Sequence, residues 1–113
     1  MNLADQKCIP CRGEVPALEP SRAKELLQEL GNGWQLNDDG HLERSYRCKN
    51  FIQAMEFANR IADIAETEDH HPDLSIAWGR CVVEIWTHKI HGLTDSDFFF
   101  AAKVVRALSK FSA

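Results

Sequence analysis

The densest group of polar side chains in the sequence is the run Glu-Thr-Glu-Asp-His-His-Pro-Asp at residues 66–73. It contains two adjacent histidines, His70 and His71, whose imidazoles can exchange protons near neutral pH. Pro72 cannot continue a helix and favours an extended conformation at His71, so we expect two rigidly held imidazoles that point in different directions. One could bind a ligand while the other transfers a proton. The simpler alternative is a solvated acidic loop with incidental histidines.

Two further residues could belong to the same chemistry. His88 follows an alternating segment and precedes Gly92-Leu93-Thr94, so it is predicted at the end of a strand beside a loop, where reactive groups often lie. Asp97 stands three residues after Thr94 and could close a capping box, with Asp in place of the usual Glu. A half-exposed terminal histidine and a helix cap would explain the two residues equally well.

The elements that must position these residues follow from periodicity. Residues 21–30 are rich in helix formers, with apolar residues on one face, and Gly31 ends this helix. Trp34 and Leu36 alternate with polar neighbours, and so do the apolar residues between 42 and 48. Asp39-Gly40 between these two segments is a strong hairpin signal. The sequence therefore predicts a helix followed by a β-hairpin.

A central helix should follow, capped by Asn50 with Gln53 and extending to about Glu66. Its expected apolar positions are Phe51, Ala54, Met55, Ala58, Ile61, Ala62 and Ala65. Residues 74–78 and 83–87 alternate around a turn at Gly79-Arg80, which predicts a second hairpin with Trp78 in its first strand. A last helix begins after Thr94, with Phe98, Ala102, Val105 and Leu108 on one stripe.

The fold class is therefore α+β, with elements in the order αββαββα. The two hairpins should combine into one four-stranded antiparallel sheet that three helices cover on one face. The other face carries Val82 and Trp86 beside Glu84 and His88. An uncovered face with such apolar residues favours a partner subunit, so we expect a homodimer or homotetramer.

Composition narrows the class of protein. The 113 residues, 44% hydrophobic and 27% charged, suit one globular domain. The net charge of −4 and the absence of a basic run argue against direct binding of nucleic acid. No stretch approaches the ~20 apolar residues of a membrane-spanning helix, and residues 1–7 lack the apolar core of a signal peptide. A cytoplasmic protein that does not bind membranes is expected.

The four cysteines are expected to be free thiols, with Cys48 and Cys81 reduced in or near the core. Cys8 and Cys11 form a CxxC pair, which could be half of a zinc site or a redox couple. No second CxxC completes a zinc site. Residues 1–17 are therefore predicted to be a loosely ordered arm, and residues 18–113 a single domain.

The chemistry-bearing residues together resemble a known family. The pattern is Glu66, His70-His71-Pro72, Trp78, Thr87-His88, Gly92-Leu93-Thr94 and Asp97 before an Ala-rich helix. It is similar to the signature of the pterin-4a-carbinolamine dehydratases, also known as dimerisation cofactors of a homeodomain transcription factor. The resemblance extends from about Leu18 to the end of the chain. The CxxC arm is not part of the family pattern.

The resemblance implies a substrate that is hydroxylated at C4a of a tetrahydropterin, the species that a pterin-dependent aromatic amino acid hydroxylase leaves behind. Loss of water gives the quinonoid dihydropterin and supports recycling, without a metal or cofactor. By similarity, His70 and His88 are the acid–base pair, His71 orients the pterin, and Asp97 anchors a catalytic imidazole. Pro72 and Thr87 are expected beside the substrate.

Two other functions fit the same residues. Three histidines and an aspartate could bind a metal and activate water for hydrolysis. Adjacent histidines rarely converge on one ion, however, because an extended backbone turns successive side chains apart. The family name also records a role as a transcription cofactor, so a protein-interaction module is the second alternative. The pterin side chain, the acid and base among the histidines, and a dimer versus a tetramer stay open.

Overall fold

The computed structural model describes residues 3–6, 8, 17–90 and 92–109. Its elements confirm the α+β class and the predicted order αββαββα. The three helices and four strands are α1 (Pro20–Leu30), β1 (Gln35–Leu36), β2 (Leu42–Arg47), α2 (Phe51–Glu68), β3 (Asp73–Ala77), β4 (Arg80–Ile85) and α3 (Asp95–Leu108). Short 3-10 helices η1 (Leu3–Asp5) and η2 (His88–Ile90) are added to these.

The four strands form one antiparallel sheet in the order β1-β2-β4-β3. The β2–β4 pair joins the two hairpins, with Leu42 opposite Ile85 and Ser45 opposite Val82. Leu42 and Ile85 are completely buried, whereas Ser45 is exposed and Val82 is half-buried. Successive strand residues point to opposite faces, so the register directs one set of side chains into the core.

The first hairpin turns where Asp39-Gly40 predicts it. Gly40 has a φ of +79°, a left-handed conformation that favours glycine, and its N–H donates to the carbonyl of Asn37. The Asn37 side-chain oxygen accepts from the backbone N–H groups of Asp39 and His41, both at 3.0 Å. One asparagine therefore organises the turn.

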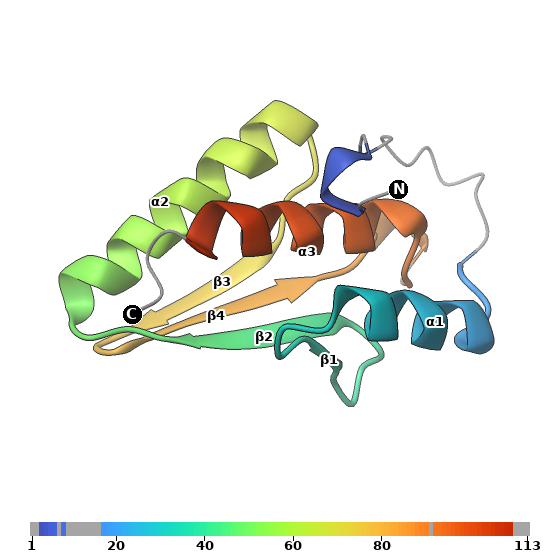
Figure 1. Ribbon diagram of the computed structural model, residues 1–113, viewed down its shortest axis with the longest axis horizontal. Helices are drawn as coiled ribbons and strands as arrows, with labels where there is room; N and C mark the ends of the chain where they lie inside the picture. The colour runs from blue at the N-terminus through green and yellow to red at the C-terminus, as the bar shows by residue number, and fades with distance from the viewer. Residues whose placement is uncertain (1–2, 7, 9–16, 91, 110–113) are drawn as a thin grey trace.

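The three helices cover one face of the sheet, with α3 between α1 and α2 (Figure 1). The core lies between these layers, and its largest fully buried side chains include Phe98, Phe100, Leu26, Leu42, Ile61 and Ile85. The sequence of α3 explains its central position, because apolar residues occupy most of its circumference. None of the described helices is both long and apolar enough to cross a membrane.

Helix α2 begins as predicted but faces the core differently. The Asn50 side chain accepts from the N–H of Gln53 at 2.8 Å, which confirms the cap. The buried stripe contains Phe57 with Ala54, Ala58, Ile61 and Ala65. Phe51, Met55 and Ala62 were expected there and are instead exposed. The helical period is compatible with burial of the residues on either side of the Ala54–Ala58–Ile61 stripe. The way α2 packs on the sheet buries Phe57 and leaves the other side exposed.

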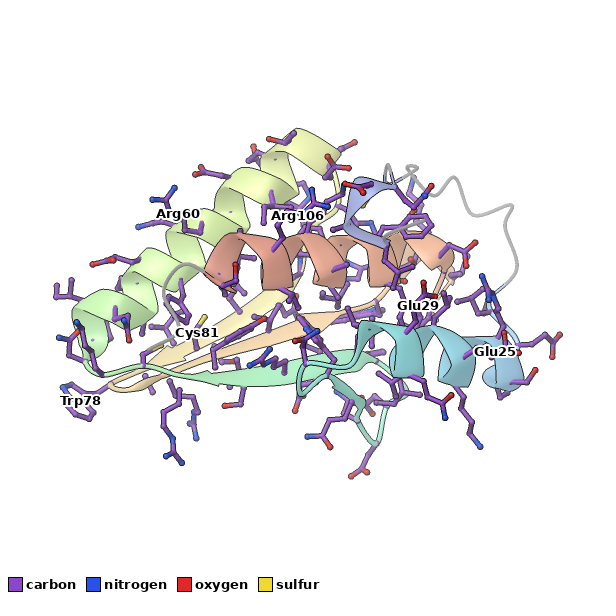
Figure 2. All side chains as sticks on the ribbon, viewed as in Figure 1. Glu25, Glu29, Arg60, Trp78, Cys81 and Arg106 are labelled. Carbon is purple, nitrogen blue, oxygen red and sulfur yellow. The ribbon has the colours of Figure 1, made fainter. Side chains whose placement is uncertain are left out.

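Trp78 also departs from its predicted place. It was expected to continue the inward alternation of the third strand, but β3 ends at Ala77 and Trp78 is 73% exposed. The chain reverses at Trp78-Gly79, and Gly79 adopts a φ of +77°. Figure 2 shows Trp78 at the tip of this hairpin, projecting from the end of the molecule. The turn therefore starts one residue earlier than the Gly79-Arg80 turn that the sequence predicts.

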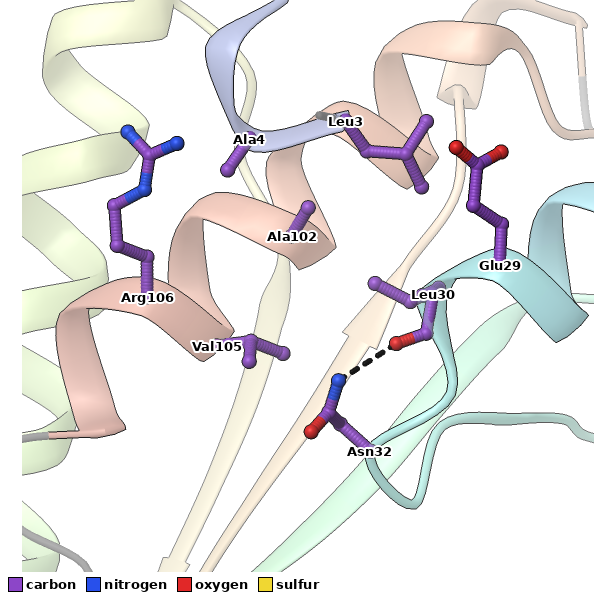
Figure 3. Close-up of a pocket in the computed structure, with 8 residues that line it drawn as sticks. All are labelled: Leu3, Ala4, Glu29, Leu30, Asn32, Ala102, Val105 and Arg106. Carbon is purple, nitrogen blue, oxygen red and sulfur yellow. Dashed lines mark hydrogen bonds between the residues drawn. The ribbon is translucent and has the colours of Figure 1, made fainter. Parts of the chain in front are cut away.

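The described part of the predicted N-terminal arm packs on the domain. Leu3 and Ala4 in η1 are buried against α3, and Lys103 donates to the Ala4 carbonyl at 2.8 Å. Figure 3 shows both residues beside a cavity that α1 and α3 also line. The volume of this cavity is about 310 Å³. Leu3 and Ala4 thus pack on a surface of α3, which the sequence alone does not reveal.

Cys8 is buried between the C-terminus of α2 and the N-terminus of α3. Its N–H donates to the Glu68 carboxylate at 3.1 Å, and its thiol lies 3.5 Å from the Ser96 carbonyl oxygen. The second cysteine of the CxxC pair, Cys11, lies outside the described residues. The free, buried thiols of Cys48 and Cys81 are as predicted.

We expect Cys8 and Cys81 to resist alkylation in the folded protein. Burial, reinforced by Glu68, raises the pKa of the Cys8 thiol to about 12, and burial raises the pKa of the Cys81 thiol to about 11. The reactive thiolate is therefore scarce at pH 8. Peptide mapping after iodoacetamide treatment should show both cysteines modified only after unfolding. Modification of Cys81 in the native protein at the rate of the unfolded chain would contradict this.

Candidate active site

Asp97 is the centre of the candidate site. Its side chain is completely buried in the first turn of α3. One carboxylate oxygen lies 2.6 Å from Nε2 of His70. The other accepts from the Thr87 hydroxyl and from the Thr94 backbone N–H, both at 2.8 Å. One buried carboxylate thus joins the loop after α2, the chain after β4 and the start of α3.

The backbone at the end of α2 aims His70 toward this carboxylate. Asp69 adopts a left-handed conformation with a φ of +51° and ends the helix. The N–H of His70 still reaches the carbonyl of Ala65 at 3.2 Å, which ties the loop to the last helical turn. The His70 side chain is only 10% exposed and lies against the ring of Phe100, with 5.8 Å between ring centres. His70 is therefore held by helix, carboxylate and aromatic ring.

His71 points elsewhere. Its Nε2 lies 2.6 Å from the Glu66 carboxylate, and both side chains are more than half exposed. The two adjacent imidazoles thus contact different carboxylates, one buried and one at the surface. This agrees with the expectation that Pro72 makes His70 and His71 point in different directions. Glu66, His71 and Pro72 line a cavity of about 290 Å³ with apolar residues of α2 and β3, and neither His70 nor His88 is among its lining residues.

His88 was predicted to be the last residue of the fourth strand, but it lies beyond the end of that strand. Strand β4 ends at Ile85, and His88 begins η2. Thr87 pairs with Gly92 in an isolated bridge, which brings these two residues together ahead of α3. The hydroxyl of Thr87 donates to the Asp97 carboxylate, and His88 is the next residue along the chain. The His88 ring packs on Trp86, with 4.3 Å between ring centres.

The structure thus brings three of the predicted residues, His70, Thr87 and Asp97, into direct contact. Sequence reasoning did not assign a site role to Glu66, the partner of His71. The sequence did offer a signal for this pair, because Glu66 lies in the last turn of α2, five residues before His71. His41, which stacks on Trp86, was also missed, because its proximity depends on the pairing of β2 with β4.

A group of possible metal ligands lies apart from these histidines. Asp39, His41 and Glu84 place one ligand atom each within 4.8 Å of one another. It is the group of this kind found in the described part of the chain, and it contains none of the residues predicted from the sequence to carry the chemistry. His41 and Glu84 already contact each other at 2.8 Å, as a histidine–carboxylate pair does without any ion.

Comparison with known proteins identifies the class to which this fold and site belong. The family described as pterin 4 alpha carbinolamine dehydratase matches residues 16–107. A relative from Rickettsia bellii that bears the name pterin-4-alpha-carbinolamine dehydratase is 58% identical over 91% of each chain. Another from Rubrobacter xylanophilus is 48% identical over 92% of this chain and 96% of its own.

A solved structure supports the same assignment. The transcriptional coactivator/pterin dehydratase from Brucella melitensis matches with a TM-score of 0.75 and 35% identity, over 80% of this chain and 97% of its own. The chain belongs to the pterin-4a-carbinolamine dehydratase family. Its activity is that of a hydro-lyase, pterin-4a-carbinolamine dehydratase.

Proposed function

We propose that the chain removes water from a 4a-hydroxytetrahydropterin by histidine general acid–base catalysis. The reaction takes a proton from N5, uses that electron pair to form the C4a=N5 double bond, and releases the C4a hydroxyl as water after protonation. No electrons are gained or lost overall, so the protein needs to supply only a proton acceptor and a proton donor. Imidazoles suit both tasks near neutral pH.

The observation that carries this proposal is the contact between Asp97 and His70. A carboxylate only accepts hydrogen bonds, so Nε2 of His70 carries the hydrogen that it shares with Asp97 at 2.6 Å. Nδ1 is then the nitrogen left to take or give a proton. The same carboxylate stabilises the imidazolium that forms when Nδ1 is protonated, and its burial strengthens that effect.

The remaining histidines take complementary roles in this proposal. His88 is exposed, adjacent to the Asp97-bound Thr87, and serves as the second acid–base group. His71, paired with Glu66 at the surface, orients the pterin, with Pro72 beside it. Positioned acid–base groups typically contribute ~10²–10⁴-fold each, which suits a dehydration that also proceeds slowly without an enzyme.

In the cell, we place this activity in the cytoplasm, beside an aromatic amino acid hydroxylase that forms the hydroxylated pterin. The test is to generate 4a-hydroxytetrahydropterin with such a hydroxylase and to follow its absorbance decay with and without the purified protein. Acceleration that the double variant His70→Ala/His88→Ala does not reproduce supports the proposal. Acceleration that is equal with wild-type protein and the double variant would overturn histidine catalysis.

We also expect the protein to be a homodimer or homotetramer. The described residues leave one sheet face without helices, and Val82 and Trp86 on it are only half-buried. Helix α2 adds the exposed apolar side chains Phe51 and Ile52. Both surfaces favour association, because contiguous apolar area gains free energy when it leaves water. Light scattering at micromolar concentration should give at least twice the monomer mass of 12.8 kDa, and a monomer would contradict the prediction.

A further inference from the structure

Three aromatic rings form a row on the sheet face that the helices do not cover. The centre of the His41 ring lies 4.1 Å from that of Trp86, and the two planes differ by only 4°. The centre of the His88 ring lies 4.3 Å from that of Trp86, at 41°. His41 comes from the first hairpin, immediately before β2, whereas Trp86 and His88 follow β4. The row therefore links the turn of the first hairpin to a proposed acid–base group.

The two imidazoles must lie on opposite faces of the indole. Both ring centres are within 4.3 Å of the same indole centre. On a single face the two imidazole rings would overlap, because each needs the full thickness and width of an aromatic ring. Trp86 is thus enclosed between two rings, and neither face is left to stack on a bicyclic substrate. Trp86 is therefore placed to support the two imidazoles and not to bind the substrate by stacking.

The far end of the row is anchored by hydrogen bonds. Nδ1 of His41 lies 2.8 Å from the Glu84 carboxylate, and the Asn37 side chain donates to the same oxygen at 2.8 Å. The His41 hydrogen bond is the main reason that the pKa of Glu84 is lowered, with a smaller contribution from Asn37. Asn37 also organises the hairpin turn. His41 is therefore held by two residues, Asn37 before β2 and Glu84 in β4.

The near end of the row is His88. It is exposed, and Trp86 is the ring against which the structure packs it. We infer that Trp86 is a positioning residue that holds the His88 imidazole in its working orientation, and that His41, anchored by Glu84, holds Trp86. This inference rests on the acid–base role proposed for His88. An exposed imidazole without such support would sample several rotamers, and few of them would direct a nitrogen at the substrate.

The test compares Trp86→Ala, Trp86→Phe and His41→Ala with wild-type protein. Misorienting a proton-transfer group weakens the transition state more than substrate binding, so Trp86→Ala should lower kcat by about tenfold with little change in KM. Trp86→Phe keeps a ring beside His88 and should recover most of the loss. His41→Ala leaves Trp86 in place without its stacked partner and should give an intermediate loss. Ser45→Ala, at an exposed position opposite Val82 on the same sheet face, is the matched control and should retain full turnover.

A second measurement does not depend on activity. The ring protons of His88, assigned by NMR through their loss in His88→Ala, should be shifted by the indole ring current in wild-type protein. They should move toward the values of a free histidine in Trp86→Ala and move partway in His41→Ala. If Trp86→Ala does not fold, Trp86→Phe and His41→Ala decide the matter.

The outcomes separate this inference from the proposed function. If His88→Ala is impaired but Trp86→Ala and His41→Ala retain full kcat, the positioning role is wrong and the acid–base role of His88 stands. If His88→Ala itself retains full kcat, the proposed function of His88 fails and the inference fails with it. A KM effect without a kcat effect in Trp86→Ala would also overturn the inference, because it would assign Trp86 to binding.

Discussion

Replacing His70 or His88 with alanine is expected to lower the turnover of the dehydration about a hundredfold or more, while the fold survives. Each change removes one of the two proposed proton-transfer groups, and such groups contribute ~10²–10⁴-fold. The double variant should be only slightly worse than either single variant, because the two groups act in one step and their effects are not additive. Steady-state turnover and thermal melting should be measured on the same preparations.

His71→Ala is the informative comparison for these variants. His71 is exposed and paired with Glu66, away from Asp97, so its loss should raise KM more than it lowers kcat. Removing Glu66 with Glu66→Gln should produce a weaker effect of the same kind. Equal losses of kcat in the His70, His71 and His88 variants would show that the division between binding and proton transfer is wrong.

Asp97→Asn should lower turnover about tenfold or more, with a smaller effect on stability. The amide cannot stabilise an imidazolium at His70 and favours the wrong tautomer if its NH₂ group faces Nε2. As a cap for α3, by contrast, Asn retains part of the geometry, so the free energy of unfolding should fall by a few tenths to ~1 kcal/mol from capping alone. Turnover and melting temperature together distinguish the two roles.

Asp95→Asn is the matched control for Asp97→Asn. Asp95 lies in the same first turn of α3 but is exposed, so this variant removes a similar charge near the helix terminus without touching the buried carboxylate. It should lose a little stability and no turnover. Unchanged turnover in Asp97→Asn would return Asp97 to a purely structural role, and an equal loss in Asp95→Asn would attribute the effect to helix charge.

Most of the fold could be predicted from local patterns. Asn50 with Gln53 and Thr94 with Asp97 indicate where α2 and α3 begin, and the structure places both helices there. Asp39-Gly40 correctly indicates the first hairpin, because few residues besides glycine adopt a positive φ without strain. These signals are short-range, so no knowledge of the rest of the chain is needed to read them.

The choice among equivalent faces could not be predicted in this way. Phe57 and Phe51 satisfy the α2 period about equally well, and only packing on the sheet buries the first and exposes the second. Trp78 continues the alternating pattern of the third strand in the sequence, but in the structure this strand ends one residue earlier, at Ala77. The packing of Leu3, Ala4 and Cys8 on the domain likewise depends on a surface that α3 forms only after folding.

The same distinction applies to the candidate site. The sequence by itself determined which residues belong to the family pattern, and Pro72 already implied that His70 and His71 point apart. Only the tertiary structure decided their partners, because Asp97 and Glu66 reach the two imidazoles from separate helices. It also decided that His41 supports Trp86, since this contact depends on the register of β2 against β4. Local patterns specify residue types and chain direction, whereas contacts between distant segments depend on how the packed elements close on one another.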